Sequence, residues 1–360
     1  MKRSTLLSLT VSTLLATNGD HLVGAGPNSR SLAGNALTIP SSAESIFLNP
    51  ALLCDQPSSI EGAFTLFKPF VTVTTDQRYG SKEPSQLIPF AGAIYQTSQA
   101  TLGVGLMGVG GMGVDYSHYP QLYGLKTKMS FAKFGLALAK KHGDFSFGVG
   151  MDMAYGRLLI QDIRQSEPTR EDMGAGYHLG FAYTSCHLHL GATYTSKISM
   201  HYQRIYDFDQ DGRPNDLHLA QPAQIALGLG WQDEKLMIEA DIKKLFWAKA
   251  QGYKDFGWRN QNIFGIGVAY QASSRLQLRA GYSYATALFD SFADPKLAFF
   301  NLVGFPALSR THIATGLRYR LDRHISLDVA VLYAPKMSKS AGLQATNRQS
   351  SLTLGVSYAF

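Results

Sequence analysis

The residues best suited to hold a metal ion are three aspartates at alternate positions, Asp207, Asp209 and Asp211, followed by Gly212. This order reproduces the first half of a calcium-binding loop, in which carboxylates alternate and a glycine allows a sharp turn. The twelfth position of such a loop should be a bidentate glutamate, but here it is His218. The pattern therefore has two interpretations, an incomplete structural calcium site or a solvated acidic turn.

Histidines gather near one turn, at His178, His187 and His189. Hydrolytic catalysis would need a nucleophile beside a histidine base, and an orienting carboxyl or amide group. No Ser–His motif accompanies these histidines. Cys54 and Cys186 lack the paired spacing of a zinc site. We therefore predict that the protein is not an enzyme and needs no cofactor, while a disulfide between the two cysteines would be compatible with export.

The composition excludes membrane-spanning helices and points to β-sheet. Beyond the N-terminus no stretch approaches the roughly 18 consecutive apolar residues that a spanning helix needs. Only 16% of residues are charged, whereas 35 are Gly, 18 Tyr and 20 Phe, which favours strands joined by tight turns. The net charge of +7 is spread along the chain, so no nucleic-acid-binding stripe is predicted.

From Ser59 onward, segments of about ten residues alternate apolar with polar or small residues, as strands with two unlike faces do. In the last segment Leu352, Leu354, Val356, Tyr358 and Phe360 share one face. Charged residues cannot face hydrocarbon cheaply, so the apolar face should meet lipid and the other face a lumen. The predicted strands are 59–72, 88–96, 100–110, 126–140, 144–158, 174–184, 187–200, 217–232, 235–247, 261–271, 274–286, 311–320, 323–334 and 349–360.

Connections between these strands alternate strictly between short and long, which is typical of an outer-membrane barrel with periplasmic turns and extracellular loops. A soluble β-sandwich has no reason to follow this alternation. The fold class predicted is therefore all-β, a 14-stranded antiparallel transmembrane β-barrel of the bacterial outer membrane. Fourteen strands enclose more space than their own side chains fill.

The N-terminal part of the chain differs from the rest. Lys2, Arg3 and a short apolar core predict a signal peptide over residues 1–16. Residues 17–57 lack alternation, contain helix-like pieces and precede the first strand, so we predict that they form a plug inside the barrel of residues 58–360. Alternation directs Lys243, Arg279, Arg318 and Arg320 inward. These cations are candidates to meet a ligand carboxylate, or they pair structurally with Glu239, Asp241 and Asp328.

The segment TNGDHLVGAGPNSRSLAGNALTIPSSAESIFLNPALL resembles the N-terminal hatch of the FadL/TodX family of transporters for hydrophobic compounds. Asn49, Pro50 and Ala51, just after Phe47, stand where that family has its NPA motif. Pro222 before LGLGW, the segments GYKDFGWRNQ and LRAGYSYA, and FPALSRTHIATGLRYRL also resemble successive family segments. The chain end, Tyr358-Ala359-Phe360, looks like the signal that barrels present to their insertion machinery in the outer-membrane lipid.

The resemblance implies a monomeric barrel that takes up long-chain fatty acids or similar hydrophobic compounds. It further implies an apolar pocket against the hatch and release of the ligand sideways through a kinked third strand. Gly108, Gly110, Gly111 and Gly113 are candidates for that kink, because glycine weakens strand pairing. Tight packing against the hatch is the other interpretation of these glycines. The alternative function is a general diffusion porin for small hydrophilic solutes, which would need no N-terminal plug.

Overall fold

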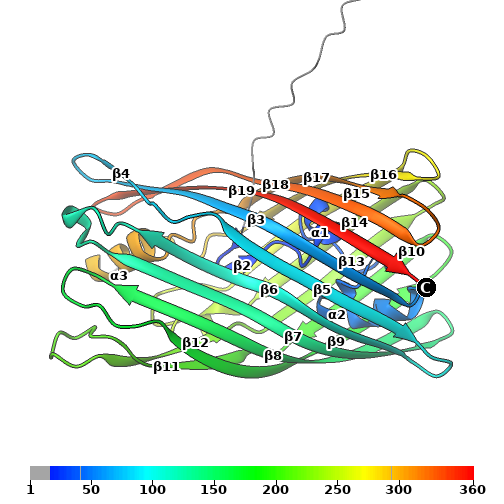
Figure 1. Ribbon diagram of the computed structural model, residues 1–360, viewed down its shortest axis with the longest axis horizontal. Helices are drawn as coiled ribbons and strands as arrows, with labels where there is room; N and C mark the ends of the chain where they lie inside the picture. Colours follow the sequence, from blue (N-terminus) through cyan, green and yellow to red (C-terminus); the bar gives the residue numbers. More distant parts are fainter. Residues whose placement is uncertain (1–16, 41, 293) are drawn as a thin grey trace, which may run out of the picture.

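The computed structural model describes residues 17–40, 42–292 and 294–360; the predicted signal peptide lies outside them. The chain forms a closed antiparallel barrel of fourteen strands, as predicted (Figure 1). Strand β19 pairs with β3 from Ala359↔Ser59 to Gln344↔Thr74 and so closes the barrel. The barrel strands are β3 (Ser59–Thr74), β5 (Gln86–Gln96), β6 (Thr101–Asp115), β7 (Lys126–His142), β8 (Phe145–Gln161), β9 (Arg170–Thr184), β10 (Leu188–Thr195), β13 (Gln224–Gln232), β14 (Leu236–Leu245), β15 (Gln261–Gln271), β16 (Leu276–Ala285), β17 (Thr311–Arg320), β18 (Ile325–Ser340) and β19 (Gln344–Ala359).

The outer surface of the barrel is apolar. In β8, Val149, Met151 and Met153 are exposed, whereas Asp152 and Ala154 on the opposite face are buried. Such alternation suits strands with one face in lipid and the other toward the interior. No helix among the described residues is long and apolar enough to cross a membrane.

The two ends of the barrel differ as the connection lengths predict. The short turns and the C-terminus lie at one end, and most long connections lie at the other (Figure 1). One prediction about the connections is wrong. Residues 335–348, expected to be a long loop, extend β18 and β19 and leave only a tight turn at 341–343. The exposed strand residues of this stretch are polar (Lys336, Ser338, Ser340, Gln344 and Arg348), so the apolar face that marks a strand in lipid is missing, as is allowed where strands extend beyond the hydrocarbon.

Two predicted strands are also shorter than expected. The ranges 187–200 and 217–232 each contain a barrel strand, β10 or β13, and part of one strand of a separate hairpin formed by β11 (Ile198–Tyr206) and β12 (Asn215–Gln221). Pro222 lies between β12 and β13 and has no N–H to donate to a sheet ladder. The hairpin therefore leaves the barrel sheet at the end with long connections, while Asp207 to Pro214 form its turn.

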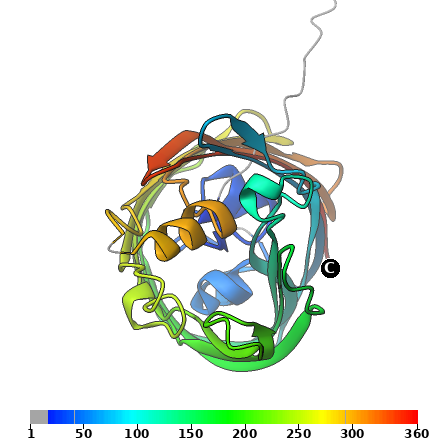
Figure 2. The same cartoon turned by 90° about the vertical axis from the view of Figure 1, so that its left-hand side faces the viewer.

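The interior of the barrel holds the N-terminal segment (residues 17–57), drawn in blue in Figure 2. It contains β1 (Thr17–Asn18), β2 (His21–Leu22), α1 (Pro27–Ser31), α2 (Ser45–Leu48) and the 3-10 helix η1 (Pro50–Asp55). The long connections carry β4 (Arg78–Gly80), η2 (Pro120–Leu122), η3 (Trp247–Lys249), α3 (Pro295–Phe299) and the π-helical turn η4 (Phe300–Gly304). Helix α3 lies across the mouth of the barrel in Figure 2.

Candidate functional site

Glycines on the inner face of the barrel make room for the N-terminal segment. A Cβ atom on Gly191 would lie 2.1 Å from the carbonyl oxygen of Leu37, and one on Gly281 would lie 2.1 Å from the carbonyl carbon of Leu32. Real Cβ contacts are never so short, so only glycine fits at these positions. A Cβ would also come within 3 Å of the N-terminal segment at Gly92, Gly103, Gly105, Gly135, Gly148, Gly180, Gly228, Gly230, Gly265, Gly316 and Gly355.

Carboxylates on the barrel wall bind the backbone of the N-terminal segment. Glu239 accepts hydrogen bonds from the N–H groups of Leu37 and Thr38, the latter at 2.7 Å. Asp241 accepts from the N–H of Ala36 at 3.1 Å. A buried backbone N–H without a partner is costly, so these bonds fix the path of a segment that has little regular structure of its own.

The predicted hatch motif lies at the contact between the N-terminal segment and the wall. The side-chain amide of Asn49 donates to the carbonyls of Leu37, at 2.7 Å, and Phe181, at 3.1 Å. Its carbonyl oxygen accepts from the N–H of Ala51 at 3.2 Å and caps η1, which begins at Pro50. Ala51 and Pro50 are buried, whereas Phe47 packs toward Gly105 and Gly135.

Three of the four candidate cations are paired with carboxylates. Arg279 and Arg318 both contact Asp328, at 2.9 and 3.0 Å. Lys243 lies 3.5 Å from Asp241 and also donates to the carbonyl of Gly34. Arg320 is exposed at the end of β17 beside a short turn. The ion pairs with Asp328 and Asp241 are those expected if these cations have a structural role. None of the four candidate cations lines the apolar cavity described below.

Loss of the Asp328 carboxylate is expected to destabilise the barrel strongly. The side chains of Arg279 and Asp328 are 3% and 1% exposed, so Asp328→Asn would leave a buried guanidinium without its counter-charge. We expect the free energy of unfolding to fall by about 3 kcal/mol, measured by urea unfolding in lipid vesicles. Asp290→Asn is the matched control, because Asp290 and Arg259 are more than half exposed and such pairs contribute little. Equal losses in the two variants would contradict this account of Asp328.

The barrel wall is interrupted between β5 and β6. The two strands pair from Gln96↔Thr101 to Phe90↔Met107 and no further. Beyond that point, residues 86–89 of β5 pair with β3, and β6 continues along β7 to Asp115↔Lys126. A bulge in β6 lies between Gly108 and Gly110. The glycines predicted to form a kink in the third barrel strand therefore lie where β6 separates from β5.

At this break, β6 takes a partner from the N-terminal segment. Gly110 pairs with His21 of β2, and the N–H of Gly111 donates to the carbonyl of Asp20 at 3.0 Å. A Cβ on Gly110 would lie 2.3 Å from that carbonyl oxygen, so the close approach needs glycine. Gly110 thus lies beside the bulge and also packs against the N-terminal segment.

The side chain of Asp20 links the N-terminal segment to the long connections. It accepts hydrogen bonds from Gln221, at 3.1 Å, and from the hydroxyl of Tyr253. Complete burial raises the pKa of Asp20, because desolvation disfavours the carboxylate more than His21, Tyr253 and Gln221 stabilise it. Asp20 therefore connects the wall break with the loops above the lumen.

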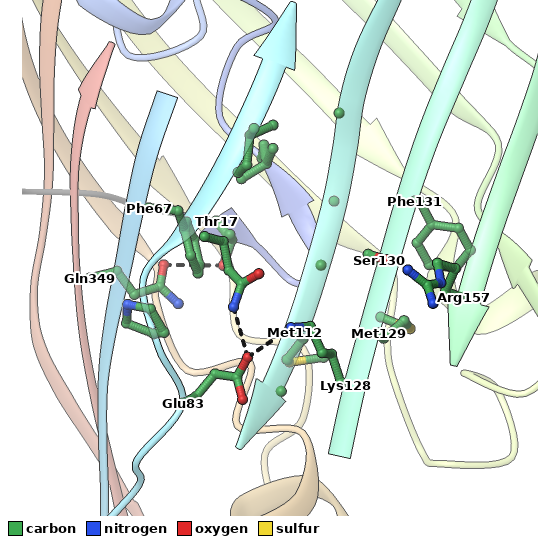
Figure 3. A pocket seen from close by; sticks show the side chains of 18 of the residues that line it. Thr17, Phe67, Glu83, Met112, Lys128, Met129, Ser130, Phe131, Arg157 and Gln349 are labelled. Atoms are coloured by element: carbon green, nitrogen blue, oxygen red, sulfur yellow. Dashed lines mark hydrogen bonds and ion pairs between the residues drawn. The ribbon is translucent and has the colours of Figure 1, made fainter. Parts of the chain in front are cut away.

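A cavity of about 290 Å³ lies at the wall break (Figure 3). Its inner part is lined by residues such as Phe67, Met129 and Phe131, and one edge is formed by Gly108 and Gly110 to Gly113. Its lining also includes Leu87 and Tyr155, which are on the lipid-facing side of their strands and are 65% and 39% exposed. The cavity therefore extends from the barrel interior through the wall.

The lining of this cavity is mostly apolar, and its charged residues are Glu83, Lys128 and Arg157. Glu83 lies 3.5 Å from the ammonium group of Lys128 and accepts a hydrogen bond from Gln86 at 2.8 Å (Figure 3). Lys128 was not predicted as a site residue. It is an even number of residues from Phe134 and Leu136 in β7, so strand alternation places it on the lipid-facing side with them. Only the separation of β5 from β6 brings it to a cavity, and strand alternation gives no signal of this.

A second cavity, of about 130 Å³, lies deeper beside the N-terminal segment. Phe47, Lys133, Lys243 and Asp241 are among its lining residues, and Leu22 lines both cavities. Lys133 is bound by Asp152 at 3.3 Å. This second cavity is more polar than the first, so an apolar molecule would prefer the cavity at the wall break.

The three aspartates of the predicted calcium loop do lie together. Their carboxylate oxygens are within 4.8 Å of one another in the turn of the β11–β12 hairpin. Asp207 accepts from the N–H groups of Asp211, at 3.1 Å, and Gly212, at 2.9 Å, and these bonds lower its pKa. This arrangement also describes a solvated acidic turn, so calcium stays a prediction. Cys54 and Cys186 are both free thiols.

The closed barrel, its apolar outer surface and its filled interior define an outer-membrane β-barrel protein. The chain belongs to the outer membrane transport protein family OMPP1/FadL/TodX, whose model matches residues 20–360. This is a family of transport proteins, not of enzymes. Comparison with curated proteins gave no match.

Solved structures share the fold at low sequence identity. The toluene transporter TodX of Pseudomonas putida is 17% identical, with a TM-score of 0.75 over 94% of this chain and 99% of that one. The toluene transporter TbuX of Ralstonia pickettii is 16% identical, with a TM-score of 0.72 and coverage of 94% and 99%. A FadL homologue of Pseudomonas aeruginosa is 13% identical, with a TM-score of 0.74 and coverage of 95% and 100%.

Proposed function

We propose that this protein carries hydrophobic molecules, long-chain fatty acids or compounds like them, passively across the outer membrane. The observation that carries this proposal is the apolar cavity that extends through the barrel wall beside β6. A hydrophilic solute has no reason to enter a cavity that opens among lipid-facing side chains. An apolar molecule that reaches this cavity can pass into the bilayer without crossing water.

The size of the cavity suits a small or flexible apolar cargo. A closed apolar cavity of about 150 Å³ holds a benzene ring, and this one measures about 290 Å³. It could therefore hold a substituted aromatic ring or a folded part of an acyl chain. Two of the similar structures are named as toluene transporters, which supports the same class of cargo.

Release is proposed to occur sideways, between β5 and β6. The backbone of β6 beyond Met107 lacks β5 as a partner, and β2 of the N-terminal segment takes part of that place. A small shift of β2 would therefore widen the opening. For a cargo with a carboxylate, Lys128 and Arg157 are the two cations among the residues that line the cavity. Their contacts with Glu83 and Glu171 would have to be exchanged for the cargo.

The N-terminal segment is proposed to act as the plug that keeps hydrophilic solutes out. Its fit against the wall glycines and its bonds to Glu239 and Asp241 support this role. A diffusion porin, the alternative function, would gain nothing from a filled lumen. A monomeric barrel is part of the proposal, since one chain supplies the cavity, the opening and the plug.

Uptake by cells that lack their own transporter tests the proposal. Cells expressing the protein should accumulate labelled oleate or labelled toluene in a saturable manner, and should not accumulate a labelled disaccharide faster than cells with an empty vector. Phe131→Asp, which places a charge in the cavity, should abolish this uptake, whereas Met151→Leu on the lipid-facing surface should not change it. Entry of the disaccharide without either apolar compound would favour the porin and overturn the proposal.

A further inference from the structure

We propose that a basic cluster on the outer surface of the barrel, formed by Lys68, Lys336 and Arg348, binds the phosphate groups of a glycolipid in the outer leaflet. The three side chains are exposed and lie on the adjacent strands β3, β18 and β19, which run side by side in Figure 1. This binding site is separate from the proposed cargo route and does not depend on it.

Strand register brings the three cations together. Arg348 of β19 is directly opposite Phe70 of β3, and Lys68 lies two residues before Phe70 on the same face. On the other side, a bulge between Ala334 and Met337 of β18 places Pro335 and Lys336 opposite Arg348. Directly opposed residues have Cβ atoms about 5 Å apart. Lys336 and Arg348 are therefore cross-strand neighbours.

Phe70 holds two of the cations around one ring. The ammonium nitrogen of Lys68 lies 5.4 Å from the centroid of this ring, and the guanidinium carbon of Arg348 lies 4.5 Å from it. Both distances are within the range of cation–π attraction. The ring thereby directs both positive groups to the same part of the outer surface, although they come from different strands.

Within residues 17–40, 42–292 and 294–360 the cluster has no counter-charge. None of Lys68, Lys336 and Arg348 forms a salt bridge with any residue that the structure describes. Like charges opposite one another in a sheet are destabilising. An arrangement of three neighbouring cations is therefore best stabilised by an anion from outside the chain, and a phosphate group matches both an ammonium and a planar guanidinium.

The height of the cluster on the barrel identifies the source of that anion. The lipid-facing residues of β3 below it, Ile60, Phe64 and Leu66, are apolar. Lys68 is eight residues above Ile60, or about 20 Å along the membrane normal for a strand tilted by roughly 40°. Since the apolar band of such barrels is about 25 Å tall, the cluster lies at its upper edge.

The upper edge is the one toward the long connections, which in these barrels face the cell exterior. The outer leaflet there is built from a phosphorylated glycolipid with several acyl chains. Its phosphates would meet the three cations while its acyl chains lie along Phe64 and Leu66. The structure thus fits one occupant, a lipid A-type glycolipid, bound at the outer surface of β3, β18 and β19.

Native mass spectrometry of the purified protein with added hexa-acylated lipid A tests this site. The wild-type protein should retain one tightly bound lipid A. The variant Lys68→Gln, Lys336→Gln, Arg348→Gln should bind it about 100-fold more weakly, at roughly fivefold for each basic side chain near an anionic surface. The control variant Lys140→Gln, Lys235→Gln, Arg275→Gln removes the same charge from exposed positions near the short turns and should bind like the wild type.

Lipid A without its phosphates provides a test that needs no variant. The wild-type protein should bind it about as weakly as the triple variant binds intact lipid A. Equal binding of the two lipids by the wild type would overturn the proposal, as would a correctly folded triple variant with unchanged affinity. Folding is checked by the heat-dependent shift in electrophoretic mobility that intact barrels show.

Discussion

A disulfide between β5 and β6 at the wall break is expected to stop the uptake of hydrophobic molecules. The change is Ile88→Cys with Gly108→Cys, in a protein whose native Cys54 and Cys186 are replaced by serine. A Cβ on Gly108 would lie 3.7 Å from the Cβ of Ile88, within the range of about 3.5–4.5 Å found in disulfides. Ile88 and Gly108 both line the cavity, so the bond would tie its two edges together.

Uptake of labelled oleate should fall to the level of the empty vector after oxidation and recover after reduction. The two single variants, Ile88→Cys and Gly108→Cys, serve as controls, because each carries one of the two changes and cannot form the bond between the strands. If uptake recovers on reduction, the loss of uptake was caused by the disulfide closing the opening and not by damage that the substitutions do to the cavity. Full oleate uptake by protein that is verified as oxidised would show that the cargo leaves by another route.

Side chains placed on the glycines beneath the N-terminal segment are expected to make the barrel leak. Gly191→Val with Gly281→Val would drive Cβ atoms against the backbone of Leu37 and Leu32, which cannot yield without displacing the segment. Overpacking costs about 1–3 kcal/mol at each site, so two sites should shift the equilibrium toward a displaced segment by about 30-fold or more. Planar-bilayer conductance should then show open channels that the wild type lacks.

Gly62→Val is the matched control for this prediction. Gly62 lies in β3, and a Cβ there would meet no atom within 4 Å. The control should remain closed, which rules out a general effect of valine for glycine in a barrel strand. A double variant that conducts no more than the control would contradict the role of the N-terminal segment as the plug.

The barrel itself was predictable because each strand carries its own signal. Alternation locates a strand wherever one face meets lipid, as with Val149, Met151 and Met153 in β8. The signal fails outside the hydrocarbon, where both faces tolerate polar residues. For that reason the parts of β18 and β19 near their connecting turn were expected to be a loop. For the same reason, parts of the two strands of the β11–β12 hairpin were predicted to belong to the neighbouring barrel strands.

The candidate site was predictable only in part. Alternation correctly directed Arg279 and Arg318 inward, but it could not show that both contact Asp328, since that depends on the register of three strands. Lys128 was missed for the opposite reason. Alternation along β7 assigns it to the lipid-facing side. It lines a cavity because the neighbouring strands separate at Gly108. Pairing between strands, unlike alternation within one, leaves little trace in a single sequence.

The position of a bound cargo is the most direct test of the proposed function. A fatty acid carrying a terminal bromine, soaked into crystals of the protein, would reveal its chain end by anomalous scattering. We expect a bromine peak inside the cavity at the wall break, among Phe67, Met129 and Phe131. A peak found only in the more polar cavity beside Lys133 and Lys243, or nowhere within the barrel, would contradict the proposed route.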